Sequence, residues 1–118
     1  MNPAEVHHTA RDWAQVHLSL RERAGDDRLW DARGRSYKIK GRTGSEERFD
    51  TSFDFRYGHH DFDFLIGVIL ARDGEVIRAF RADRATFYRF EHSNIDSLRF
   101  RLSQSGPEKD AVDWLVGP

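Results

Sequence analysis

The chain has 118 residues, 20 acidic and 19 basic side chains, a formal net charge of −1 and no cysteine. This length suits one domain with a single core. The absence of cysteine excludes disulfides, zinc–thiolate sites and thiol catalysis, and the balanced charge excludes a whole-molecule field that attracts nucleic acid. The longest apolar run, Phe64 to Ala71, is too short to span a membrane, and the first residues lack an apolar signal core, so we expect one cytoplasmic domain over residues 1–118.

The N-terminal segment has the apolar spacing of an amphipathic helix. Asn2 before Pro3 suits a helix start, and Gly25 suits a helix end. These signals predict a helix over residues 3–24 that packs on a sheet. Its apolar stripe consists of Ala10, Trp13, Ala14, Val16, His17 and Leu20.

A β-hairpin is predicted next. Residues 29–32 and 36–42 have the composition of two strands around a turn at Gly34. Successive side chains of a strand point to opposite faces, so Tyr37 and Ile39 should face the core. The other face of the second strand carries the cations Lys38, Lys40 and Arg42.

The middle of the chain predicts a second hairpin. Residues 62–70 are almost continuously apolar, which is typical of a central strand buried on both faces. Residues 75–81 should pair back with this strand across a turn at Gly74. Residues 49–57, with four spaced aromatic side chains, leave a strand and a short helix open as alternatives.

The C-terminal part predicts smaller elements. Asp83 can cap a short helix over residues 84–90, and residues 97–102 alternate as an amphipathic edge strand does. A capping-box start at residues 105–108 predicts a last helix that carries Val112, Trp114 and Leu115. We therefore expect an α+β or mixed α/β fold, with an N-terminal helix, a central, mainly antiparallel mixed β-sheet and flanking helices.

The cationic face of the first hairpin is the strongest candidate for chemistry. A metal-dependent nuclease needs carboxylates to hold Mg²⁺ and a cation near the attacking water or the scissile phosphate. In this strand Lys38 occupies the position that suits a metal ligand, one strand step from Lys40, and a protonated Lys cannot ligate Mg²⁺. The residues alone indicate a phosphate-binding face, and a solvated strand face is the alternative.

Three other groups of residues invite functional interpretations. Arg48 and Arg56 lie among the aromatic residues of segment 49–57, a pattern that holds single-stranded nucleic acid, although an aromatic core is the alternative. The run His59-His60-Asp61-Phe62-Asp63 offers transition-metal ligands, but a polar turn before a strand also explains it. The aromatic residues of segment 87–90 could contribute to a protein interface.

Together, the Lys38-Ile39-Lys40 hairpin, the strand Phe62-Asp63-Phe64-Leu65-Ile66-Gly67-Val68-Ile69-Leu70 and the hairpin after it resemble a family of small bacterial proteins with the restriction-endonuclease-like PD-(D/E)XK fold. The resemblance covers about residues 12–102. Its most specific part is the Phe-Asp-Phe-Leu strand and the spacing of this strand from the Lys-Ile-Lys strand. The resemblance implies this fold for the whole chain and, in a member with an intact site, Mg²⁺-dependent cleavage of nucleic acid.

The family's motif matches this chain in part. Its catalytic Lys corresponds to Lys40, and the basic residue that follows corresponds to Arg42. Its Glu or Gln before that Lys corresponds to Lys38, its metal-binding Asp falls near Arg28, and the Glu of its first helix falls near Gln15. Two positions of the metal site are thus cations, which implies a conserved scaffold with a lost metal site.

Three functions follow as hypotheses. The first is a catalytically degenerate domain, without a cofactor, that binds nucleic acid or a protein partner through Lys38, Lys40 and Arg42, with Arg48 and Arg56 as further nucleic-acid contacts and a homodimer as one arrangement. The second is an active nuclease in which Asp27 or Asp31 binds Mg²⁺ and Lys40, beside Lys38, positions the attacking water. The third is an interaction protein of the immunity or antitoxin type, or a complex subunit.

Overall fold

The computed structural model describes residues 1–45, 51–56, 61–93, 97–102 and 106–117. The elements in chain order are α1 (Pro3–His17), β1 (Arg21–Glu22), β2 (Leu29–Trp30), β3 (Ser36–Thr43), β4 (Thr51–Arg56), β5 (Phe64–Leu70), β6 (Val76–Asp83), α2 (Arg84–Arg89), β7 (Glu91–Ser93), β8 (Ser97–Leu102), α3 (Glu108–Ala111) and β9 (Asp113–Val116). Among these described elements, no helix is both long enough and apolar enough to cross a membrane.

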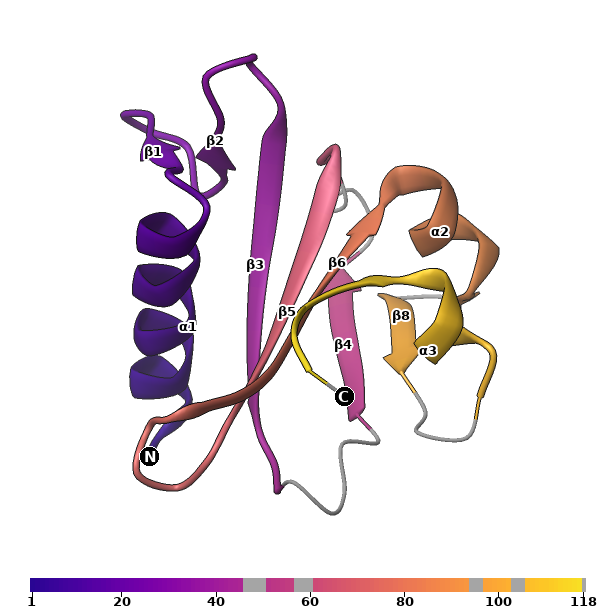
Figure 1. Cartoon of the computed structure of the whole chain (residues 1–118). Coiled ribbons are helices and arrows are strands. Elements are labelled where there is room, and N and C mark those ends of the chain that lie inside the picture. The colour runs from indigo at the N-terminus through magenta and orange to yellow at the C-terminus, as the bar shows by residue number, and fades with distance from the viewer. Residues whose placement is uncertain (46–50, 57–60, 94–96, 103–105, 118) are drawn as a thin grey trace.

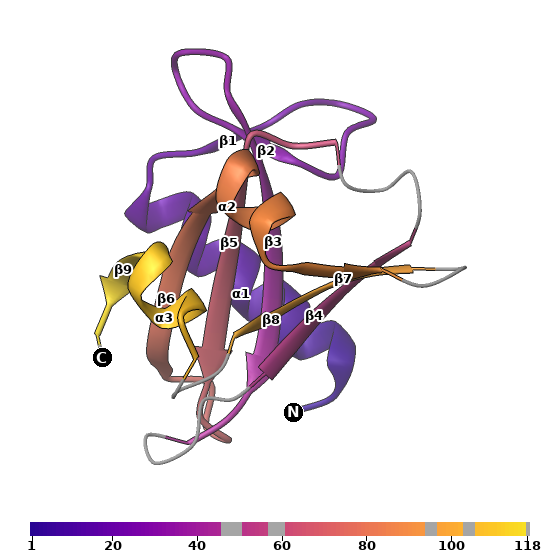
Figure 2. The same ribbon diagram turned by 90° about the vertical axis from the view of Figure 1, so that its right-hand side faces the viewer.

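The strands form two sheets. Within the described residues, six strands form the main sheet in the order β1-β2-β3-β5-β6-β9, in which β3 and β5 are parallel and the other neighbours are antiparallel. The strands β4, β8 and β7 form a smaller antiparallel sheet, in that order. Helix α1 lies on one side of the main sheet, and the small sheet, α2 and α3 lie on the other side (Figures 1 and 2). The predicted α+β architecture, a helix on a mixed, mostly antiparallel sheet, is confirmed.

Helix α1 begins as the sequence predicts. The Asn2 side chain accepts a hydrogen bond from the backbone N–H of Glu5 at 2.8 Å, and Pro3 follows at the first helical position. The helix packs on β3 and β5 through Val6, Ala10 and Ala14, which are buried. These short side chains let the helix approach the sheet closely.

The end of α1 differs from the prediction. The helix stops at His17 instead of continuing to residue 24, and Ser19 adopts the left-handed region with φ of 52°. This reversal carries Leu20 back into the core, where it is 4% exposed, and leads into β1. Val16, which was expected in the apolar stripe, is 75% exposed, because the packed face of the helix follows Val6, Ala10 and Ala14.

The central strand β5 separates two apolar cores. Ile66, Val68 and Leu70 face α1, while Leu65 and Ile69 join a second cluster with Phe62, Phe80, Ala82, Phe87 and Val112. The prediction of a strand buried on both faces is therefore confirmed. The predicted hairpin from β5 to β6 and the helix capped by Asp83 are also present, with Asp83 accepting from the Thr86 N–H at 2.7 Å.

The C-terminal predictions need correction. Residues 97–102 form β8, the middle strand of the small sheet and not an edge strand. The last predicted helix shrinks to α3, which Pro107 precedes without a side-chain cap, and Trp114 and Leu115 belong to β9. Strand β9 pairs with β6, so the hydrogen bonds gained at the sheet edge outweigh the weak helical pattern. Segment 49–57, left open by the sequence, contains the strand β4.

A polar clasp joins the starts of β3 and β5. The Asp63 carboxylate accepts a hydrogen bond from the Ser36 N–H at 2.8 Å and from the Ser36 hydroxyl at 3.3 Å. The Asp63 N–H in turn lies 3.1 Å from the Ser36 Oγ and 3.0 Å from the Ser36 carbonyl oxygen. This clasp fixes where β5 meets β3, and therefore which side chains of β3 face each side of the sheet.

Candidate functional site

Strand β3 divides its side chains as predicted. Tyr37 and Ile39 are buried among the residues that pack under α1. The alternate positions hold Lys38, Lys40 and Arg42, which are partly buried and so do not form an open, solvated face. The Lys38 side chain is only 17% exposed.

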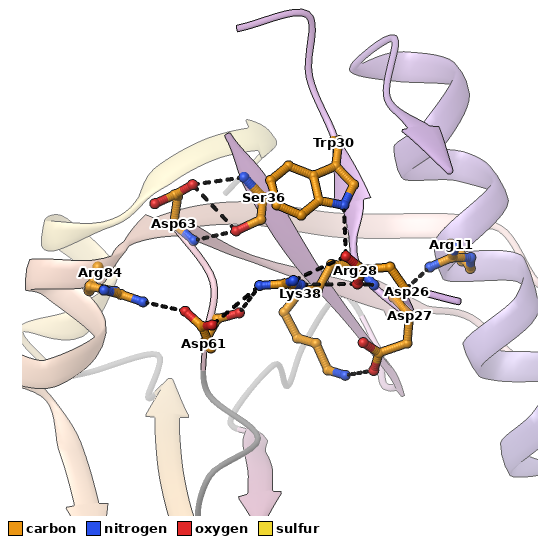
Figure 3. Close-up of polar contacts among 10 residues, drawn as sticks. All are labelled: Arg11, Asp26, Asp27, Arg28, Trp30, Ser36, Lys38, Asp61, Asp63 and Arg84. Atoms are coloured by element: carbon orange, nitrogen blue, oxygen red, sulfur yellow. Dashed lines mark hydrogen bonds and ion pairs between the residues drawn. The ribbon is translucent and has the colours of Figure 1, made fainter. Parts of the chain in front are cut away.

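Lys38 forms an ion pair with Asp27. Its ammonium group donates a hydrogen bond to the Asp27 carboxylate, and the Arg11 guanidinium donates to the Asp27 carbonyl oxygen at 2.7 Å (Figure 3). The hydrogen bond from Lys38 lowers the pKa of Asp27 below its ordinary value. The structure thus brings together one predicted acid and one predicted cation, from the segment before β2 and from β3, while the Asp27 side chain stays 74% exposed.

Asp31 has a different role. Its carboxylate accepts hydrogen bonds from the backbone N–H groups of Arg33 and Arg35 at 2.9 and 3.0 Å, from Arg35 Nε at 2.7 Å and from the Tyr37 hydroxyl at 2.9 Å. Burial by itself would raise the pKa of Asp31, but the hydrogen bonds from Arg35 and Tyr37 together lower it to about 2. These contacts hold the hairpin turn between β2 and β3, and Asp31 is absent from the residues that line the cleft beside Lys38.

Asp26 and Arg28 form a second, tightly connected pair beside Lys38. The Asp26 carboxylate accepts from the Arg28 N–H at 2.9 Å, from Arg28 Nε and Nη2 at 3.0 Å each, and from Trp30 Nε1 at 3.1 Å. The side-chain hydrogen bond from Arg28 is the main reason that the pKa of Asp26 falls far below its usual range. These contacts fix the Arg28 guanidinium group beside the Lys38 strand.

Asp61 connects this pair to α2. Arg28 Nη1 lies 2.9 Å from the Asp61 carbonyl oxygen and 3.5 Å from its carboxylate Oδ2, while Arg84 Nη2 lies 3.1 Å from Oδ1. Sequence reasoning treated Asp61 as a possible metal ligand and missed Arg84 entirely. The three residues are far apart along the chain, so no local pattern marks them as a cluster.

These side chains surround a polar cleft of about 490 Å³, which we call the Lys38 cleft. Its lining residues are Ala24, Gly25, Asp26, Asp27, Arg28, Lys38 and Asp61. The charged groups around it come from the segment before β2, from β3 and from the segment before β5 (Figure 3). Three carboxylates and two cations line the cleft. An anion can therefore bind there only where a cation is not fully neutralised by a carboxylate.

A second concave surface lies between α1 and β3. This α1–β3 groove has a volume of about 270 Å³ and is lined by Met1, Pro3, Val6, His7, Lys40, Gly41, Arg42 and Thr43. Burial lowers the pKa of His7, and the positive charges of Arg11, Lys40 and Lys38 lower it further. Helix α1 therefore adds the cation Arg11 to those of β3, whereas the lowered pKa keeps His7 mostly neutral at pH 7.

The residues around the Lys38 cleft fit Mg²⁺ poorly. Mg²⁺ requires several oxygen ligands in octahedral geometry, usually including one or two carboxylates and substrate phosphates. In the part of the chain that the structure describes, no three potential metal ligands among His, Asp and Glu converge. Asp26, Asp27 and Asp61 each contact a cation, and the Lys38 ammonium holds the Asp27 carboxylate that a metal would need.

The remaining predicted residues divide into two groups. Arg48, His59, His60 and the side chain of Arg56 lie outside the described part of the chain. Among the three aromatic residues suggested as an interface, Phe87 is fully buried in the core and Tyr88 is 40% exposed. A continuous aromatic surface at α2 is therefore not formed by these side chains.

Comparison with known proteins adds no relative: no protein-family model matches the chain, and no curated protein matches it.

Proposed function

We propose that this chain is a non-catalytic domain of the restriction-endonuclease-like class that binds nucleic acid through phosphate contacts along β3 and α1. The observation that carries the proposal is the ion pair between Lys38 and Asp27. A nuclease of this class needs its carboxylates to bind a metal ion. Here the Lys38 ammonium group neutralises Asp27, the predicted metal ligand that lines the cleft. We therefore take the metal site as lost, because cations engage the carboxylates of the Lys38 cleft.

The fold is compatible with the class but does not identify it. The chain has an N-terminal helix on a mixed sheet, a hairpin that carries the Lys38-Ile39-Lys40 strand, and a buried strand beside it. These are the parts on which the family resemblance rests. Fold alone carries no activity, so the proposed function depends on the charged groups of the site.

Three cations support nucleic-acid binding, Arg11 of α1 and Lys38 and Lys40 of β3. Burial lowers the pKa of His7 in α1, and these three charges are close enough to lower it further. Phosphate contacts from Lys and Arg supply most of the affinity of sequence-independent binding, and they do not require a strongly basic protein. A ligand that crosses from α1 to β3 would meet cations on both elements.

Fluorescence anisotropy with labelled single-stranded and double-stranded oligonucleotides tests the binding. Lys40→Ala should weaken binding by about 1 kcal/mol and reduce the slope of log K against log salt by about 1, because one phosphate contact is lost. Lys109→Ala is the matched control, since it removes the same charge from α3, which does not line the α1–β3 groove. Equal binding by both variants and the wild type would contradict the proposed surface.

A cleavage assay with Mg²⁺ or Mn²⁺ tests the non-catalytic part. We expect no cleavage of the oligonucleotides that bind. Cleavage that Asp27→Asn abolishes would refute the non-catalytic part of the proposal. It would support the alternative of a nuclease with a rearranged site, in which the exposed Asp27 carboxylate of the Lys38 cleft binds the metal ion.

A further inference from the structure

Asp61 is an exposed carboxylate held between two arginines. Its side chain is 83% exposed, and its two carboxylate oxygens lie 3.5 Å from Arg28 Nη1 and 3.1 Å from Arg84 Nη2. The arginines approach from different parts of the fold, Arg28 from the segment before β2 and Arg84 from the start of α2 (Figure 3). Guanidinium groups bind phosphate as well as carboxylate, so two of them that converge on one small anion can also bind a phosphate group.

Each arginine is held in place by contacts other than the one with the Asp61 carboxylate. The Asp26 carboxylate accepts hydrogen bonds from Arg28 Nε and Nη2, at 3.0 Å each. The same carboxylate also accepts a hydrogen bond from the Arg28 backbone N–H. Arg84 Nε donates to the Phe62 carbonyl oxygen at 3.1 Å, and Phe62 is buried in the core. If the Asp61 side chain turned away, Arg28 Nη1 would still donate one N–H to the Asp61 carbonyl oxygen at 2.9 Å. Both guanidinium groups would keep their places, and each would turn an N–H toward the space that the carboxylate had left.

The Asp61 contacts are also weak enough to be replaced. An ion pair with a largely exposed partner is screened by water and salt and contributes little to stability. A terminal phosphate group offers three acceptor oxygens and up to two negative charges, so it satisfies both arginines better than one carboxylate does. The Lys38 ammonium group lines the same cleft but is paired with Asp27, so the two arginines are the groups that attract the anion.

We infer that Arg28 and Arg84 form a binding site for one phosphate group, and that the Asp61 carboxylate occupies this site as an internal competitor until the phosphate displaces it. This inference rests on the proposed function only in assigning the phosphate to a nucleic acid. The site itself is a separate claim, because inorganic phosphate alone can probe it.

The test is an NMR titration of the full chain with inorganic phosphate, following the Nε–Hε signals of Arg28 and Arg84. Asp61→Asn keeps the size of the side chain and removes the competitor, and it should bind phosphate on the order of fivefold more tightly than the wild type, as expected when weak exposed ion pairs are released. Asp73→Asn is the control for net charge, since Asp73 is an exposed carboxylate in the turn between β5 and β6. It should leave the affinity unchanged.

A double variant separates a specific site from a general gain in positive charge. Arg84→Gln in the Asp61→Asn background should lose the gain, and its thermal unfolding shows whether the fold is intact. If the Arg84 side chain proves necessary for folding, Arg84→Lys supplies the same comparison, because it keeps the charge but cannot contact both Phe62 and the phosphate. An Asp61→Asn affinity equal to that of Asp73→Asn, or a gain that survives the loss of Arg84, would overturn the inference.

The outcomes for the two proposals can be told apart. Tighter phosphate binding by Asp61→Asn, without oligonucleotide binding by any variant, would support the phosphate site and contradict the proposed function. Oligonucleotide binding that depends on Lys40 but is unaffected by Asp61→Asn, together with an unchanged phosphate titration, would support the proposed function and overturn this inference.

Discussion

The substitution Gly41→Ala tests how the helix and the cationic strand are held together. Gly41 of β3 lies directly under α1, and a Cβ built on it would lie 2.9 Å from the Ala10 Cβ and 3.0 Å from both Cγ1 and the carbonyl oxygen of Val6. Gly41 does not adopt a positive φ, so alanine suits its backbone conformation. The substitution therefore isolates the effect of space.

The expected cost follows from these distances. Carbon atoms pack best at about 3.5–4.0 Å, so α1 would have to move away from β3 by roughly 0.5–1 Å. One contact is with the backbone of the helix, which cannot turn aside as a flexible side chain would. Overpacking of this kind costs about 1–3 kcal/mol, and we expect the free energy of unfolding to fall by that amount.

Chemical denaturation measures this loss, and Gly117→Ala is the matched control. A Cβ at Gly117 would meet only the Arg78 guanidinium, at 3.6 Å, so its substitution should be close to neutral. The displaced helix should also carry His7 and Arg11 away from Lys38 and Lys40, and the pKa of His7 should rise toward its ordinary value. If Gly41→Ala unfolds at the same denaturant concentration as Gly117→Ala, the close packing of α1 on β3 is wrong.

Two further predictions concern charged side chains near the hairpin. Because the folded-state pKa of Asp31 is lowered to about 2, its stabilising contribution should be complete above the unfolded pKa and lost as the pH falls toward 2. Asp31→Asn should cost about 2 kcal/mol at pH 7 and flatten the pH dependence of unfolding below about pH 4, and parallel pH profiles for variant and wild type would contradict this reasoning. Lys40→Ala removes a positive charge near His7 and should raise the pKa of His7 in an NMR titration, whereas an unchanged pKa, or the same rise in Lys109→Ala, would show that Lys40 does not act on His7.

Much of the main sheet could be predicted because its signals are local. The Asn2-Pro3 start of α1, the alternation in β3 and the continuous apolar run of β5 each need only a few neighbouring residues to be recognised. The strand β9 could not be recognised in this way. Trp114 and Leu115 fit a short helix or a strand, and only the pairing with β6, some thirty residues earlier, decides between them.

The candidate site was only partly predictable for the same reason. The second hairpin strand correctly indicated a cationic face with Lys38 and Lys40, but it could not show that Lys38 is paired with Asp27. Asp31 was considered as a metal ligand, although an Asp in a tight turn often accepts backbone hydrogen bonds from residues two and four positions later, as it does here. The convergence of Arg28 and Arg84 on Asp61 depends on the tertiary fold.

The clasp between Ser36 and Asp63 has a consequence for the speed of ligand exchange. Asp61 is followed at once by Phe62, which is 1% exposed in the core, and then by Asp63, which is fixed to Ser36. The backbone after Asp61 is therefore anchored, and its carboxylate can leave the two arginines simply by rotating about its side-chain bonds. Rotamer changes of exposed side chains take picoseconds to nanoseconds, far less than the opening of a loop. Arrival of an anion at this position would then be limited by diffusion, without a slow conformational step before it.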